Sequence, residues 1–99
     1  MVLIVFRSSL ETDVQNVLKA AGVQAYTDFR HVVGVGEAGA RLDTFERPGS
    51  NSMILAALSH EDATRLVERL RSFRDASTAG RHGVRVPLRA FVLPCSQAI

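Results

Sequence analysis

The sequence is poor in cysteine and has no hydrophobic run long enough to cross a membrane. Cys95 is the single cysteine, so the chain cannot form an internal disulfide, and the expected location is a reducing, cytoplasmic one. All apolar runs fall far short of the ~20 residues that a membrane helix needs, which predicts no direct membrane insertion. The apolar stretch Val2–Phe6 lacks the basic segment and cleavage site of a signal peptide.

Sequence signatures of catalysis, metal binding and nucleic-acid binding are also missing. The chain has no nucleophile elbow, no Cys/His pair and no P-loop, so no catalytic residue is assigned. His31, His60 and His82 have no close metal-ligand spacing, and no metal ligand is assigned. With no lysine-rich stripe, no aromatic interleaving and no helix-turn-helix pattern, no nucleic-acid partner is expected.

A literal GxGxxG stands at positions 34–39, but its context is wrong for a dinucleotide site. The 99 residues form one domain, 1–99, which is too short for a doubly wound nucleotide fold. The following segment, 40–48, lacks the apolar stripe of a helix and ends at a proline. These glycines are therefore interpreted as a hinge where a strand enters a loop.

The basic residues are concentrated in the second half of the chain. Residues 65–89 hold seven of the eleven arginines against two acidic residues, whereas residues 1–64 carry five basic and eight acidic side chains. A basic half of this kind favours an anionic partner.

In the first part of the chain the apolar pattern predicts a strand and a helix. Val2–Phe6 is apolar at every position, which is typical of a strand buried on both faces. Ser8 and Glu11 have the spacing of a capping box. Apolar residues then recur at helical spacing until Gly22, which predicts a helix over Ser9–Ala21.

In the middle of the chain the pattern predicts two strands and a long loop. Val23–Val35 alternates, with Phe29, His31, Val33 and Val35 on one face, as in a half-buried strand. Gly36–Asn51 has the glycines and mixed charges of a long loop. Within it, we expect Glu37–Ser50 to be mobile without ligand. Ser52–Leu58 is apolar on both faces and predicts a second central strand.

In the last part the pattern predicts a helix, a loop and an edge strand. Ser59, with Asp62 three positions later, begins the helix. The apolar stripe of this helix consists of Ala63, Leu66, Val67, Leu70 and Phe73. Ala76–Gly83 is interpreted as a turn-rich loop and Val84–Val92 as a strand. Because Pro87 cannot donate to a ladder, this strand is expected at an edge.

The order β-α-β-β-α-β predicts an α+β, ferredoxin-like fold with a four-stranded antiparallel sheet and two helices on one face. Right-handed crossovers place the first and third strands in the centre. The other sheet face then keeps half of each central strand exposed, with Ile4 and Ile54 as interface positions if they point that way. An apolar patch of this size indicates an oligomer closed through the open face.

The segment Gly80-Arg81-His82-Gly83-Val84-Arg85 is the best candidate for a ligand site. Guanidinium groups beside exposed backbone N–H groups suit a phosphate or a carboxylate. A solvated connection with incidental arginines fits the same residues equally well.

Taken together, these features resemble the PII-like superfamily of small trimeric signalling proteins. The resemblance covers nearly the whole chain. It depends on the βαββαβ order, the glycines after the second strand, the long loop that follows and the basic, glycine-rich loop before the last strand.

The resemblance implies a ligand site and a partner loop. In the family, the loop before the last strand helps to bind an adenine nucleotide between subunits, and the long loop engages target proteins. The implied ligand-binding residues are Gly34, Gly36, Gly80, Arg81, His82, Gly83 and Arg85. The implied partner loop, 37–50, presents Glu37, Arg41, Asp43, Phe45 and Arg47 to a transporter or other target protein.

The chain departs from nitrogen-regulating PII proteins in three respects. The long loop lacks their tyrosine signature, the loop lysine is missing, and the tail Pro94–Ile99 has no basic residue. The resemblance is therefore to divergent PII-like groups and implies a non-enzymatic regulator. No cofactor is required, and the expected ligand is an adenine nucleotide or a small anion. The alternatives are a metal-handling trimer similar to CutA and a small ferredoxin-like dimeric enzyme of the isomerase or monooxygenase type.

Overall fold

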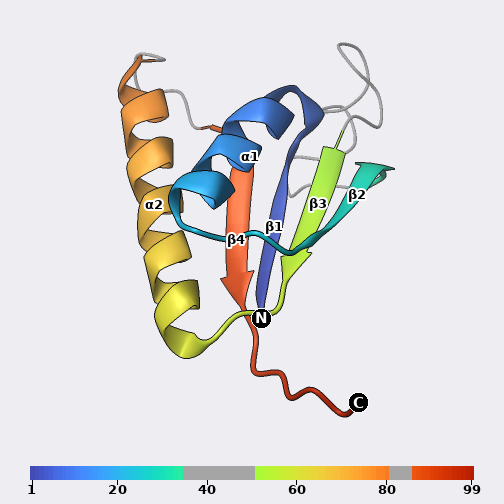
Figure 1. Ribbon diagram of the computed structural model, residues 1–99. Coiled ribbons are helices and arrows are strands. Elements are labelled where there is room, and N and C mark those ends of the chain that lie inside the picture. Colours follow the sequence, from blue (N-terminus) through green and yellow to red (C-terminus); the bar gives the residue numbers. More distant parts are fainter. Residues whose placement is uncertain (35–50, 81–85) are drawn as a thin grey trace.

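A computed structural model describes residues 1–34, 51–80 and 86–99 (Figure 1). The elements run in the order β1 (Val2–Arg7), a 3-10 turn (Ser8–Leu10), α1 (Glu11–Ala20), β2 (Thr27–Val32), β3 (Asn51–Ala56), α2 (His60–Gly80) and β4 (Leu88–Val92). The sheet order is β2-β3-β1-β4 and each neighbouring pair is antiparallel. This confirms the predicted ferredoxin-like fold, with Pro87 preceding an edge strand.

Both helices lie on one face of the sheet, and the core forms beneath them (Figure 1). Alternate residues of the central strands point toward the helices: Val2, Ile4 and Phe6 on β1, and Ser52, Ile54 and Ala56 on β3 are all buried. From the helices, Val14, Leu18, Ala63, Leu66 and Leu70 complete this core. Removing this apolar surface from water is the main favourable term in folding the domain.

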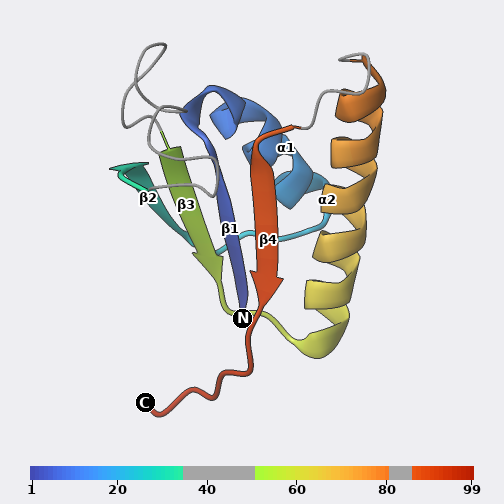
Figure 2. The ribbon, with the colours of Figure 1, turned by 180° about the vertical axis from the view of Figure 1, so that it is seen from behind.

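The other face of the sheet has no helix over it (Figure 2). Leu3 and Val5 of β1 and Met53 and Leu55 of β3 are half-buried there. Register places Phe29 beside Met53 and Phe91 beside Leu3, and these rings are 41% and 46% exposed. Ile4 and Ile54 point to the helices instead, so they are not positions on the open face.

The end of α1 is fixed by a glycine in the left-handed region. Gly22 has a φ of +81°. Its N–H donates to the Lys19 carbonyl over 3.0 Å, and the Val23 N–H donates to the Leu18 carbonyl over 2.9 Å. This is the Schellman arrangement, in which the residue after the glycine packs against the helix. Val23 is therefore part of the core, and β2 begins at Thr27 rather than at the predicted Val23.

The predicted start of α1 is wrong in its details. No side chain caps the helix or the 3-10 turn before it. The Ser8 hydroxyl instead forms a hydrogen bond of 2.9 Å with the Ser52 hydroxyl of β3. The capping prediction for α2 is confirmed, because the Asp62 N–H donates to Ser59 Oγ over 3.2 Å.

Helix α2 is longer than predicted and β2 is irregular. The helix continues to Gly80, so residues 76–80 are helical, although the sequence pattern predicts a loop over Ala76–Gly83. The helix extends this far because the alanines of this segment are strong helix formers and no proline occurs before position 87. In β2, a register shift between Arg30 and Val32 leaves His31 as an extra residue with a φ of +57°. The predicted alternation of Phe29 with His31 and Val33 is therefore broken at His31.

Gly22→Ala should lower the free energy of unfolding by about 1 kcal/mol or more, because a Cβ is strained at this positive φ. Urea unfolding measures the change. The matched control is Gly80→Ala, where φ is not positive and a Cβ meets no atom within 4 Å. That variant should be neutral or slightly stabilising, and equal losses in both variants would contradict the explanation.

Candidate functional site

Two of the seven predicted ligand-binding residues lie in the described part of the chain. Gly34 and Gly80 are both exposed, and a Cβ at either would meet no atom within 4 Å, so the backbone there is open to an approaching group. Outside the described residues lie Gly36, Arg81, His82, Gly83 and Arg85, and also Glu37, Arg41, Asp43, Phe45 and Arg47 of the predicted partner loop.

The two described glycines belong to opposite sides of the domain. Gly34 follows β2 at one edge of the sheet, whereas Gly80 ends α2, which runs beside β4 at the other edge (Figures 1 and 2). One chain therefore does not bring Gly34 and Gly80 together. A site that contains both needs a second copy of the chain.

The end of α2 sets an electrostatic condition for the predicted site. Gly80 is the last residue of a 21-residue helix with no basic residue in its last turn. The unpaired carbonyls at a helix C-terminus carry a partial negative charge, which disfavours a bound anion. Any anion held just beyond this helix end therefore depends on positively charged side chains, and Arg81 and Arg85 are the nearest along the chain.

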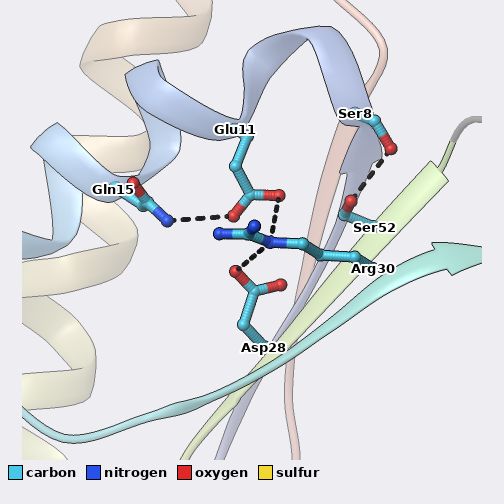
Figure 3. A network of polar contacts seen from close by, with 6 residues as sticks. All are labelled: Ser8, Glu11, Gln15, Asp28, Arg30 and Ser52. Carbon is cyan, nitrogen blue, oxygen red and sulfur yellow. Dashed lines mark hydrogen bonds and ion pairs between the residues drawn. The ribbon is translucent and has the colours of Figure 1, made fainter.

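A second polar constellation joins α1 to the sheet (Figure 3). Its six members are Ser8, Glu11, Gln15, Asp28, Arg30 and Ser52. The Arg30 Nε lies 3.8 Å from Glu11 Oε1 and 3.4 Å from Asp28 Oδ2. Gln15 Nε2 donates to Glu11 Oε2 over 3.2 Å.

The two carboxyl groups of this cluster lie in a poorly solvated position. The Glu11 and Asp28 side chains are only 18% and 17% exposed. Desolvation, together with the hydrogen bond and charge of Asp28, raises the pKa of Glu11, while Ser52 and Arg30 act in the opposite direction. Among the described residues, Asp28 Oδ1 is the one buried side-chain polar atom without a hydrogen-bond partner. Glu11 therefore binds a proton more tightly in this position than an exposed glutamate does.

Two surface grooves lie next to α2, away from this cluster. The larger, about 420 Å³, lies between α1 and α2 and is lined by Val17, Ala20, Arg65, Glu68, Arg69 and Ser72. The other, about 270 Å³, includes His60, Val67 and Val92.

Within residues 1–34, 51–80 and 86–99, no three His, Cys, Asp or Glu side chains are grouped closely enough to hold a metal ion. In the same part of the chain, none of the helices could span a membrane.

A model of the family described as nitrogen regulatory protein P-II matches residues 1–99. The chain belongs to this family. Solved structures agree: CPII, a nitrogen regulatory PII-like protein from Thiomonas intermedia K12, is 24% identical with a TM-score of 0.64 over 91% of this chain and 78% of its own. A PII-like signaling protein from Thermus thermophilus is 26% identical with a TM-score of 0.62 over 91% and 79%. Comparison with curated proteins found no match.

Membership of the P-II family agrees with the resemblance inferred from the sequence. The low identities of these P-II structures, 24% and 26%, fit a divergent member. Residues 33–50, which contain the whole predicted partner loop 37–50, connect β2 to β3, and residues 81–87 connect α2 to β4. Both connections are in the order that the resemblance implies.

Sequence reasoning missed the Glu11–Asp28–Arg30 cluster of this P-II chain. The sequence pattern places Glu11 in a capping box, and Asp28 and Arg30 fall on the parity of the segment 23–35 opposite to Phe29 and His31. That parity was the available signal, because Asp28 faces the helix side, opposite Ile54. A charge on the covered side of an edge strand requires a polar partner on the helix above it.

Ser52→Ala should lower the free energy of unfolding by about 1 kcal/mol, because the Ser8 hydroxyl loses its partner. Urea unfolding measures this. In a double-mutant cycle, Ser8→Ala/Ser52→Ala should cost less than the sum of the single changes. Ser72→Ala, at an exposed serine, is the control and should be neutral. Strictly additive costs would show that the hydroxyl pair contributes nothing.

Proposed function

We propose that this P-II chain is a cytoplasmic, non-enzymatic regulator that binds an adenine nucleotide or a small anion between subunits and presents residues 37–50 to a partner protein. The observation that carries the proposal is the family match over residues 1–99. CPII, which shares the fold, has been solved with ADP, AMP and bicarbonate and with ADP, AMP and acetate. An adenine nucleotide and a small carboxylate are therefore the first ligands to test.

The charge distribution of the chain supports this ligand class. Seven of the eleven arginines lie within residues 65–89, on both sides of the segment that follows α2. A guanidinium group binds phosphate or carboxylate oxygens through two parallel hydrogen bonds. The exposed Gly80 directly precedes Arg81 in the sequence, and the exposed Gly34 lies beyond the opposite edge of the sheet, where a second copy would have to bring it to these charges. Among the described residues, no grouping favours the metal-handling alternative.

The uncovered sheet face supports assembly into a homotrimer, the form that P-II proteins adopt. Leu3, Val5, Met53 and Leu55 form an apolar surface that a neighbouring copy would remove from water. Burial of such a surface is worth roughly 25 cal/mol per Å². Assembly through this face also supplies the second copy that a site with both Gly34 and Gly80 needs.

Arg81→Ala should weaken binding of an adenine nucleotide about 10-fold to 100-fold, because one charge-assisted contact is worth roughly 1.5–3 kcal/mol. Isothermal titration calorimetry with ATP, ADP, AMP and cyclic AMP, with and without bicarbonate, measures the affinity. Arg81→Lys should recover only part of it, because an ammonium cannot form the two parallel bonds. Arg85→Ala tests the second predicted contact in the same way.

The matched control for these variants is Arg74→Ala, on the exposed surface of α2 where Arg74 pairs with Asp75 over 3.2 Å. It should bind as tightly as the wild-type chain. If no adenine nucleotide binds the wild-type protein at millimolar concentration, the nucleotide proposal is wrong. If one binds and neither Arg81→Ala nor Arg85→Ala weakens it, the residue assignment is wrong.

Leu3→Glu should dissociate the assembly into monomers, because Leu3 pairs with Leu55 and Phe91 on the open face and a carboxylate there would lose its hydration. Size-exclusion chromatography with light scattering measures the mass. The control is Asn16→Glu, at an exposed position of α1, which should leave the mass of a trimer unchanged. A wild-type chain that is monomeric at micromolar concentration would remove the basis of the trimer proposal.

A further inference from the structure

Polar and charged side chains of edge strand β2 face helix α1. None of its six residues is fully buried, so the strand has no hydrophobic anchor in the core. Its ladder with β3 is interrupted by the bulge at His31. On the helix side, β2 meets α1 through ionisable groups: Arg30 Nε lies 3.8 Å from Glu11 Oε1 and 3.4 Å from Asp28 Oδ2 (Figure 3). Asp28 also raises the pKa of Glu11.

The groups around Glu11 do not balance its charge when it is ionised. From its own helix, Gln15 donates one neutral hydrogen bond, and from β3 the Ser52 hydroxyl forms another. From β2 come the carboxylate of Asp28 and the guanidinium of Arg30. Two ionised carboxyl groups and one arginine leave a net charge of −1 in a position where both carboxyl groups are largely shielded from water.

A single proton on the Glu11–Asp28 pair removes this net negative charge. It brings the net charge of the cluster to zero and allows the hydrogen bond between the Glu11 and Asp28 carboxyl groups, which two ionised carboxylates cannot form. The need for it is greater because Asp28 Oδ1 is buried and finds no donor among the described residues. The arginine compensates weakly, since its side chain is 58% exposed and its Nε lies 3.4 Å or more from either carboxylate.

We propose that Glu11 and Asp28 form a proton switch: a proton on this pair favours the form in which β2 is held against α1, and loss of that proton favours release of the strand. The released Glu11 keeps a favourable place, because it is the first residue of α1 and a negative charge is stabilised at a helix N-terminus. Strand β2 leads into the segment that connects it to β3. Release of β2 in response to pH therefore frees the strand end from which the chain continues into residues 35–50.

The direction of the effect follows from linkage. The closed contact raises the pKa of Glu11 above its ordinary 4.5, so the closed form binds the proton more tightly than the released form. The proton therefore favours the closed form most at low pH. This preference disappears as the pH rises from 4.5 through the raised pKa.

Amide hydrogen exchange of the full-length chain at pH 5 and pH 8, corrected for intrinsic exchange rates, tests the switch. The opening equilibrium of β2 should increase toward pH 8, about tenfold for each unit by which the pKa of Glu11 is raised, while β1 stays unchanged. Glu11→Gln should abolish the increase, because its amide can donate to Asp28 and cannot lose a proton. Asp13→Asn, at an exposed acid of the same helix turn, should keep it.

Carbon-13 NMR titration of the Glu11 carboxyl group gives an independent measurement. Its midpoint should lie above 4.5 in the wild-type chain and should fall in Asp28→Asn, because the asparagine amide donates to ionised Glu11 and removes the neighbouring charge. A wild-type midpoint at or below 4.5, or an equal rise in β2 exchange in wild type and Glu11→Gln, would overturn the proposal. No ligand is present in either experiment, so the outcome is independent of the nucleotide site.

Discussion

The structure depends on an imbalance between its sheet and its helices. The central strands β1 and β3 carry apolar side chains on both faces, while α1 and α2 cover only one of them. Val2, Ile4 and Phe6 are removed from water by the helices, whereas Leu3 and Val5 on the reverse face are only half-buried. The same strand that builds the core of one chain therefore also builds the surface through which we propose that chains assemble.

The two edges of the sheet are fixed by different physical means. Next to β4, the Pro87 carbonyl accepts a hydrogen bond from the Arg7 N–H over 3.1 Å, and Val86 is buried, so apolar burial supports this edge. Strand β2 has no buried side chain, and its link to α1 runs through charged groups. Charge pairs respond to pH and salt far more than apolar contacts do. The edge that leads into the predicted partner loop is thus the more responsive one.

This arrangement has a consequence for the function of a P-II protein. Gly34 and Gly80 lie beyond opposite edges of the sheet, so the proposed ligand site is completed only by assembly. The C-terminal end of α2 disfavours an anion by itself, so the proposed site depends on the arginines that follow this helix in the sequence.

The sequence by itself determined the element order, the central position of the doubly apolar strands and the edge position of the strand after Pro87, because hydrophobic periodicity and backbone chemistry are local properties. It also determined the helix end at Gly22, where only a residue without a Cβ adopts the required φ at little cost. Local patterns predicted the candidate ligand segment after α2 as well, but its partner glycines at 34 and 36 were linked to it only through a family resemblance.

The tertiary structure decided what depends on neighbours distant in sequence. Ser8 has the spacing of a helix cap, yet its hydroxyl bonds to Ser52, 44 positions away, because β3 brings that group closer than the helix end. Glu11 is an ordinary acid in the sequence and becomes one of a shielded carboxyl pair only when β2 places Asp28 beneath α1. The parity of β2 indicates a charge on its covered side, but which side chain pairs with that charge follows from the fold as a whole.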